Sequence, residues 1–367
     1  MKAKKNKGTK TLALIKNLAK GVYEKILKKK QPELSMPIRS LTNVKYDPKD
    51  GYFELLGKTK KRTLTATTVK SFAQTLRMLA LSKEVLENDD IATKREVYYV
   101  SKNWGDARFK EQPESDAVMD DIEAMLMVNR EQLGFVPEER GGDIAGKLIV
   151  IDKDPTTGKQ IKIDCSKFGS GAYSAPTSVE HLKFQTKAKF ILAVETASMF
   201  QRLVKHKFWQ KANCILVNMK GVPTRACRRF IRRLSDEMNL PVYVFTDGDP
   251  YGYFNIYRTL KVGSGNAAHI NKYFCVPQAK FLGITPDDII NYKLPTHPLK
   301  DIDIKRAKDA LKNDPFVQHY KEWQKAIKKL ISMKVRAEQQ AFAKHGLNYV
   351  IEHYLPEKLK NPKSWLP

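Results

Sequence analysis

Two adjacent tyrosines, Tyr98 and Tyr99, lie in a segment whose pattern predicts a helix. Thr93 and Glu96 form a Ser/Thr-x-x-Glu capping box, which places the start of that helix at Thr93. At about 100° per residue, Tyr99 faces nearly opposite the apolar side that contains Val97, whereas Tyr98 lies at the edge of that side. Helical phase therefore favours Tyr99 as the phenol that is free to react.

Cations flank Tyr99 on the predicted helix. Arg95 precedes it by four residues, Lys102 follows it by three, and Lys94 lies at the helix start. Cations next to a phenol can hold a phosphate and favour ionisation of the phenol, whose ordinary pKa is about 10. This pattern would suit a tyrosine nucleophile that attacks phosphorus, and Lys94 and Lys102 are candidate contacts for a DNA phosphate. The alternative is a tyrosine that merely lies over an exposed helix surface.

A second group consists of carboxylates at strand ends. Asp247 and Asp249 follow the apolar run 242–245, and Glu195 follows the apolar run 190–194. Close carboxylates repel one another unless a cation lies between them, and carboxylate oxygens are the ligands that Mg²⁺ prefers. The sequence therefore predicts a magnesium site at one edge of a sheet, where the carboxyl ends of parallel strands meet. The alternative is that these acids only end strands and cap helices.

A third group is a run of arginines on one face of a helix after Gly221-Val222-Pro223. Such a basic face suits the phosphate backbone of DNA, although a solvated helix surface is the plainer interpretation. The arginines of this face are Arg225, Arg228, Arg229, Arg232 and Arg233.

The elements around these residues indicate a mixed fold. Helical patterns followed by a basic hairpin at 147–164 predict a winged helix-turn-helix domain over residues 66–165. A further hairpin is expected at 52–65, turning at Gly57-Lys58. Residues 1–65 are expected to form a basic extension, whose apolar helical stripe packs either on its own chain or on another subunit.

A second domain of α/β type is expected over residues 185–367. Three short apolar runs, 190–194, 214–217 and 241–245, alternate with helical stretches. Continuous apolar strands separated by helices indicate a mostly parallel sheet that is covered on both faces. No chemistry is expected in the charged helical segment from Pro286 onward.

Composition favours a polyanionic partner. The 367 residues contain 66 Lys and Arg against 40 Asp and Glu, a formal net charge of +26. No run of about 18 apolar residues appears, so we expect a cytoplasmic protein that binds nucleic acid rather than a membrane. The four cysteines lie far apart, which predicts buried free thiols rather than a zinc site or a disulfide framework.

Three ordered motifs resemble the A subunits of the DNA topoisomerase VI family, and the resemblance extends over about residues 65–367. The meiotic double-strand-break transesterase is a relative of that family. The motifs are Lys-Arg-Glu-Val-Tyr-Tyr at 94–99, Val-Glu-Thr-Ala-Ser-Met at 194–199 and Thr-Asp-Gly-Asp-Pro-Tyr-Gly at 246–252.

The resemblance implies a winged-helix (CAP-like) domain followed by a Toprim α/β domain. Tyr99 would be the nucleophile, Arg95 would assist it, and Glu195, Asp247 and Asp249 would hold Mg²⁺. Two A subunits would make a staggered break in duplex DNA through 5′-phosphotyrosine links. Two B subunits would bind ATP and drive passage of a second duplex, giving an A2B2 heterotetramer associated with chromosomal DNA.

Two alternatives stay open at this point. A break-forming transesterase without strand passage would share every motif, and only ATP-dependent relaxation with a B subunit separates it from a topoisomerase. A winged-helix regulator that is not an enzyme would have no use for the carboxylates and should prefer one DNA sequence over others.

Overall fold

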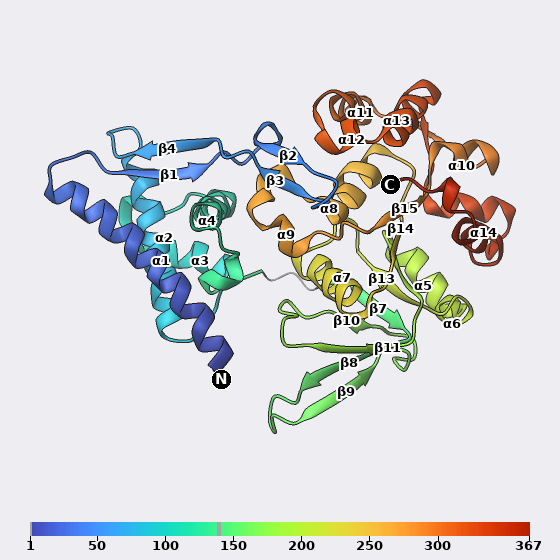
Figure 1. The fold of residues 1–367 in the computed structure, drawn as a ribbon, viewed down its shortest axis with the longest axis horizontal. Coiled ribbons are helices and arrows are strands. Elements are labelled where there is room, and N and C mark those ends of the chain that lie inside the picture. The colour runs from blue at the N-terminus through green and yellow to red at the C-terminus, as the bar shows by residue number, and fades with distance from the viewer. Residues whose placement is uncertain (1, 138–140) are drawn as a thin grey trace. The chain divides into compact units, whose positions relative to one another are not determined.

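The chain divides into two compact units in a computed structural model that describes residues 2–137 and 141–367, with side chains from Lys10 onward. The chain passes between the units several times rather than once (Figure 1). The first unit comprises Met1–Lys45, Glu54–Glu138 and Gly265–Ile270. The second comprises Tyr46–Phe53, Glu139–Ser264 and Asn271–Pro367.

The first unit is mainly helical. Its short strands form two pairs, one antiparallel between β1 (Glu33–Pro37) and β4 (Thr59–Thr63), and one parallel between β5 (Ala92–Thr93) and β6 (Phe135–Val136). Its main helices are α1 (Lys2–Leu27), α2 (Val69–Glu87), α3 (Lys94–Val100) and α4 (Gln112–Leu126).

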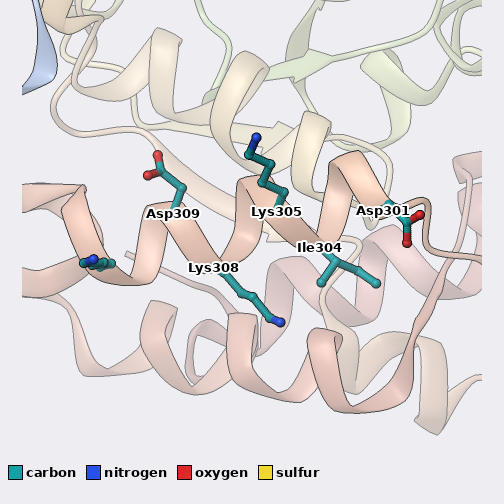
Figure 2. A pocket seen from close by; sticks show the side chains of 6 residues that line it. Asp301, Ile304, Lys305, Lys308 and Asp309 are labelled. Atoms are coloured by element: carbon teal, nitrogen blue, oxygen red, sulfur yellow. The ribbon is translucent and has the colours of Figure 1, made fainter.

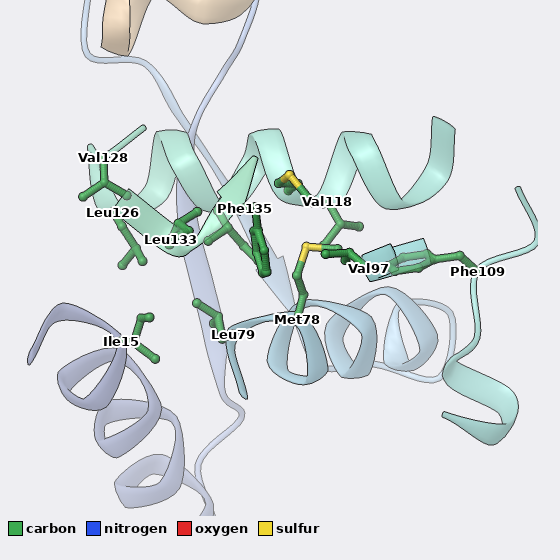
Figure 3. Packing of buried hydrophobic residues seen from close by; sticks show 12 residues of the cluster. Ile15, Met78, Leu79, Val97, Phe109, Val118, Leu126, Val128, Leu133 and Phe135 are labelled. Carbon is green, nitrogen blue, oxygen red and sulfur yellow. The ribbon is translucent and has the colours of Figure 1, made fainter. Parts of the chain in front are cut away.

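The core of the first unit joins all four helices (Figure 3). Met78 of α2, Val97 of α3 and Ile122 of α4 are fully buried in it, and Ile15 of α1 packs against them. Ile15 and Val22 of the α1 stripe therefore pack on their own chain, whereas Ala19 and Ile26 of the same stripe are exposed. The described part of this segment, with α1 and β1, is grouped with the first unit.

The hairpin expected at 52–65 does not form. The two strands are present, but β3 (Phe53–Leu55) pairs with β2 (Val44–Tyr46), and β4 pairs with β1. The buried side chain of Asn43 accepts a hydrogen bond from the backbone N–H of Lys58 at 3.0 Å and donates one to the carbonyl of Lys58 at 2.8 Å. This amide holds the chain open where a tight turn was predicted.

A six-stranded sheet forms the centre of the second unit. Strands β12 (Phe190–Val194), β13 (Cys214–Asn218) and β14 (Val242–Phe245) run parallel to one another, which confirms the predicted strands. Every residue of β12 and β13 is buried, as their continuous apolar sequences require. The sheet order is β10-β7-β13-β12-β14-β15, and β15 (Lys280–Gly283) is also parallel to its neighbour β14. Strand β7 (Asp143–Gly146) runs antiparallel to β13, and β10 (Tyr173–Ser174) runs antiparallel to β7.

The predicted hairpin at 147–164 is present, but it belongs to the second unit. It consists of β8 (Leu148–Lys153) and β9 (Gln160–Asp164), and β11 (Lys183–Thr186) pairs with the free edge of β8. Leu148 and Val150 of β8 are buried in this three-stranded sheet. The hairpin therefore lies outside the helical unit for which it was expected to provide a wing.

Helices α5 and α6 of the second unit contact β13 of the six-stranded sheet. All four cysteines are buried and unbonded to one another, as predicted. Within residues 2–137 and 141–367, no helix combines the length and hydropathy needed to cross a membrane. The helices of this unit are α5 (Ala197–Lys205), α6 (Phe208–Lys211), α7 (Arg225–Met238), α8 (Arg258–Lys261), α9 (Asn271–Phe274), α10 (Pro286–Asn291), α11 (Asp301–Asn313), α12 (Pro315–His319), α13 (Lys321–Met333) and α14 (Leu355–Lys360).

Candidate active site

Helix α3 begins as the sequence predicts. The Thr93 hydroxyl accepts a hydrogen bond from the Glu96 N–H at 3.2 Å, and the Glu96 carboxylate accepts one from the Thr93 N–H at 2.6 Å. Val97 is fully buried, while the side chain of Tyr99 is 56% exposed. The phenol of Tyr99 therefore faces outward on a helix that is fixed at its start and on its inner side.

Tyr98 is held by the protein, unlike Tyr99. Its hydroxyl donates a hydrogen bond to the Lys110 carbonyl at 3.1 Å. The Lys102 ammonium lies 4.1 Å from the centre of the Tyr98 ring and donates to the Phe109 carbonyl at 2.8 Å. Lys102 was expected beside Tyr99, but α3 ends at Val100 and the tighter 3₁₀ turn Ser101–Asn103 directs Lys102 to Tyr98 instead.

Arg95 is the cation that lies at Tyr99. Its guanidinium carbon is 6.0 Å from the centre of the Tyr99 ring, at the distance of a cation–π contact. Lys94, expected to contact DNA, forms an ion pair with Asp116 of α4. The helix thus presents an exposed phenol with one guanidinium next to it, while both neighbouring lysines are bound within the protein.

The predicted carboxylates meet at the carboxyl edge of the six-stranded sheet. Glu195 directly follows β12, and Asp247 lies two residues beyond β14, which is the neighbour of β12 in the sheet. The backbone N–H of Asp247 donates a hydrogen bond to Glu195 Oε2 at 2.8 Å. We call Glu195, Asp247 and Asp249 the acidic edge.

The two carboxyl groups that meet there resist ionisation. Burial raises the pKa of Glu195, and the negative charge of Asp247 raises it further. Burial and the charge of Asp249 also raise the pKa of Asp247, although a hydrogen bond from the Gln339 N–H opposes the rise. Glu338 adds negative charge near both groups. A bound cation would relieve this repulsion.

Asp249 is turned toward other partners. It is buried, its Oδ1 accepts a hydrogen bond from the Gly252 N–H at 2.7 Å, and its Oδ2 lies 3.4 Å from Arg336 Nη1. Accordingly, over the described ranges, no three or more Asp, Glu, His or Cys side chains gather closely enough to hold a metal ion. The predicted three-carboxylate arrangement is therefore only partly assembled.

The residues of the acidic edge nevertheless fit Mg²⁺. This ion is often held by one or two carboxylates together with water and phosphate oxygens. Glu195 and Asp247 provide such a pair, both with hard oxygen donors and with charges that repel in the absence of a cation.

Three residues at this edge were missed by sequence reasoning. Arg336, Glu338 and Gln339 belong to the segment after Pro286, where no chemistry was expected, and all three approach the acidic edge. They lie about ninety residues beyond Asp247, and no motif or spacing in the sequence connects them to it. The one available signal was their polar character directly after the helix Lys321–Met333.

The arginines of α7 do not form the free basic face that the sequence indicates. Arg228 is buried, and Arg229 forms a two-point ion pair with Glu180 at 2.6 and 3.0 Å. Arg232 bonds Asp236 and the Cys275 carbonyl. The guanidinium of Arg233 bonds the carbonyls of Val179 and Leu182. Arg225 is half-buried, as are Arg229, Arg232 and Arg233.

A hollow on α11 is unrelated to this site. Its lining side chains come from the outer surface of that one helix, and no residue of the acidic edge lines it (Figure 2). The lining residues are Asp301, Ile304, Lys305, Lys308, Asp309 and Lys312.

Three family models match the chain in succession. Residues 70–135 match a model described as "Type IIB DNA topoisomerase", and residues 138–188 match "All-beta domain in DNA topoisomerase VI alpha subunit". Residues 190–359 match the model of the Toprim domain that the A subunit of topoisomerase 6 has in common with Spo11. The fold and its acidic edge thus place the chain in the class of type IIB DNA topoisomerases. The second model also assigns the 147–164 hairpin to a separate β domain rather than to a winged helix.

Archaeal relatives refine this class. The A subunit of type 2 DNA topoisomerase 6 from Methanocaldococcus jannaschii is 57% identical over 95% of this chain and 94% of its own length. Those from Archaeoglobus fulgidus and Methanothermobacter thermautotrophicus are 38% and 37% identical, over 93% and 94% of this chain and 94% and 96% of their own lengths. The chain belongs to the family of DNA topoisomerase VI A subunits, and it is the catalytic subunit of a type IIB topoisomerase.

Proposed function

We propose that the chain cleaves duplex DNA through Tyr99. The phenolic oxygen of Tyr99 attacks a backbone phosphorus, forms a 5′-phosphotyrosine bond and loses its proton. The bond from phosphorus to the 3′ oxygen breaks, and that oxygen leaves as a 3′ hydroxyl after taking up a proton. One phosphodiester replaces another, so rejoining needs no ATP. The observation that carries this proposal is the exposed Tyr99 phenol beside Arg95.

Arg95 and the acidic edge supply the charges for this step. The Arg95 guanidinium stabilises negative charge that develops on the phosphate, an effect that is often the largest single contribution to such catalysis. Glu195 and Asp247 hold Mg²⁺, with Asp249 as the third candidate ligand. Bound Mg²⁺ supplies further positive charge at the phosphate oxygens. Lys94, Lys102, Arg225, Arg228, Arg229 and Arg232 remain the candidate DNA contacts, although most of them have partners within the chain.

The proposed fold of the DNA-cleaving unit is a winged helix. Helices α2, α3 and α4 pack around one core and carry Tyr99 on the short helix α3, as expected for a helix-turn-helix arrangement. The wing would have to come from the first unit itself, since the hairpin at 147–164 lies in the second. The antiparallel pair β1–β4 is the candidate, because it packs near α4 and carries three consecutive basic residues, Lys60, Lys61 and Arg62.

The working enzyme is proposed to be an A2B2 heterotetramer. Two A subunits face each other so that each Tyr99 acts with the acidic edge of its partner, and they make a staggered double-strand break. ATP binds to the B subunits and drives passage of a second duplex. The sequence of this chain lacks a Gly-x-x-x-x-Gly-Lys-Ser/Thr loop, consistent with ATP binding on B. Its charge of +26 suits binding of chromosomal DNA.

The test is a supercoil-relaxation assay of the chain purified with its B subunit. We expect relaxation that requires ATP and Mg²⁺, and a denaturant-trapped protein–DNA complex whose protease digest carries the nucleotide on Tyr99. Cleavage with no relaxation would instead support a break-forming transesterase without strand passage. Nucleotide attached to another residue would refute the assignment of Tyr99.

A further inference from the structure

A segment from the C-terminal half of the chain runs along the acidic edge. Gly248, between Asp247 and Asp249, forms an antiparallel bridge with Ala337, and its N–H donates to the Ala337 carbonyl at 2.8 Å. On one side of Ala337, Arg336 reaches Asp249, and on the other side Gln339 reaches Asp247. Residues 336–339 therefore contact the Asp247–Asp249 segment from a distant part of the sequence.

Gln339 is the most highly connected residue of that segment. It is fully buried, and three hydrogen bonds of 2.8 Å join it to three different parts of the site. Its backbone N–H donates to Asp247 Oδ1. Its side-chain amide donates to the carbonyl of Phe245, the last residue of β14. Its side-chain oxygen accepts a hydrogen bond from the hydroxyl of Thr196.

These three bonds link the ends of two strands. Thr196 directly follows Glu195 after β12, whereas Phe245 and Asp247 belong to the end of β14. The Gln339 side chain thus links the Thr196 hydroxyl, next to Glu195, to the backbone of Phe245, two residues before Asp247. The two carboxyl groups repel each other, and such a pair keeps a defined separation only if the surrounding bonds hold it.

We propose that Gln339 is a positioning residue for the metal site, setting the separation of Glu195 and Asp247 so that they bind one divalent cation together. Mutation of a residue that orients the direct ligands of a metal in this way commonly lowers metal affinity by about 10- to 100-fold. This inference rests on the proposed role of Glu195 and Asp247 in holding Mg²⁺, and it assigns no direct contact with the metal to the Gln339 side chain.

The experiment measures Mn²⁺ binding to the full chain by electron paramagnetic resonance, without DNA and therefore without reference to activity. Gln339→Met keeps the length of the side chain and removes both side-chain hydrogen bonds. We expect Mn²⁺ affinity to fall about tenfold, with cleavage restored at high metal concentration. DNA affinity in EDTA should stay within about twofold of wild type. This measurement is the control for folding, because a substitution that only disrupted the fold would lower DNA affinity as well.

Three further variants make the test specific. Thr196→Val removes the hydroxyl that donates to the Gln339 side chain, and it replaces Gln339→Met in the test if Gln339→Met does not fold. Thr196→Ser keeps the hydroxyl and should bind Mn²⁺ normally. Gln340→Ala alters an exposed neighbour that bonds Ser198 and should also bind normally. In the double variant with Gln339→Met and Thr196→Val, the loss of Mn²⁺ binding free energy should be smaller than the sum of the losses in the two single variants, because both substitutions remove the same hydrogen bond.

The outcomes separate this inference from the proposed metal role. If Asp247→Ala weakens Mn²⁺ binding while folded Gln339→Met and Thr196→Val bind like wild type, the positioning role is refuted and the metal role stands. If Asp247→Ala binds Mn²⁺ as well as wild type does, the positioning role of Gln339 and the metal role of Asp247 are both refuted. Weaker binding in all three variants, with normal binding in Thr196→Ser and Gln340→Ala, supports both.

Discussion

The guanidinium carbon of Arg95 lies 6.0 Å from the centre of the Tyr99 ring, one turn earlier on the same helix. A phosphate attacked by Tyr99 would therefore meet the Arg95 charge as negative charge develops. We expect Arg95→Ala to slow formation of the covalent DNA complex by about 10²- to 10³-fold, and Arg95→Lys to retain part of the rate. Single-turnover cleavage measures both. Lys102→Ala, which alters a cation directed at Tyr98, should have a much smaller effect.

Substitution of the two adjacent tyrosines should have opposite effects on covalent attachment to DNA. Tyr99→Phe should abolish covalent attachment to DNA, since it removes the attacking oxygen but leaves an exposed position otherwise unchanged. Tyr98→Phe should retain attachment and lose about 0.5–1.5 kcal/mol of stability with the hydrogen bond to Lys110. Denaturing gels of trapped complexes and urea unfolding measure the two effects. Attachment that survives in Tyr99→Phe would overturn the assignment.

Removal of a carboxylate should separate DNA binding from cleavage. Asp247→Ala is expected to bind duplex DNA with wild-type affinity and to lose Mg²⁺-dependent cleavage, because binding depends on phosphate contacts elsewhere. Wild type in EDTA should behave in the same way. Gel-shift and cleavage assays on one DNA substrate compare them, and equal cleavage with and without EDTA would remove the metal from the mechanism.

The stability of the metal-free chain should depend on Glu195. Its pKa is raised in the folded chain, so the folded state holds the proton more tightly than the unfolded state does. The free energy of unfolding therefore falls as the pH rises above the ordinary carboxyl value of 4.5 and through the raised folded value. In EDTA, Glu195→Gln should raise stability at about pH 8.5 by on the order of 1 kcal/mol or more and change it little near about pH 5.

Urea unfolding at the two pH values checks this dependence. The exposed Glu352→Gln serves as the control and should leave both values unchanged. Mg²⁺ should stabilise wild type more at the higher pH, where both carboxyl groups are ionised, and a stabilisation by Mg²⁺ that grows toward low pH would contradict the expected linkage.

Arg233 of α7 should matter for stability more than for DNA binding. Arg233→Ala removes the side-chain donor from the Leu182 carbonyl and one of two donors from the Val179 carbonyl, at a cost of about 1–3 kcal/mol. The slope of log affinity against log salt concentration should stay unchanged, since that slope counts phosphate contacts. Lys211→Ala is the exposed control on the same unit. A shallower slope in folded Arg233→Ala would show that Arg233 contacts DNA after all.

Local patterns in the sequence predicted the elements that depend on neighbouring residues. The capping box at Thr93 is a four-residue signal that ends at Glu96, and it forms as expected. Continuous apolar runs predicted β12 and β13, since only a strand buried on both faces tolerates them. The meeting of Glu195 with Asp247 followed from a general property of parallel sheets.

Features that depend on distant partners were not predictable in this way. Lys102 was assigned to Tyr99 by helical phase, but the helix tightens after Val100 and the lysine finds the Phe109 carbonyl. The strand at 148–153 pairs with residues 183–186 as well as with its own hairpin partner, and this removes the expected wing. Gln339 reaches the acidic edge from a segment with no motif at all.

The order of segments along the chain has a consequence for how the molecule can be divided. Each unit takes short pieces from remote parts of the sequence, with Gly265–Ile270 completing the first and Tyr46–Phe53 contributing to the second. A gene fragment cut near residue 138 would therefore leave both halves incomplete. A separately expressed tyrosine-bearing unit would therefore need Gly265–Ile270 joined to it by a linker, rather than simple truncation.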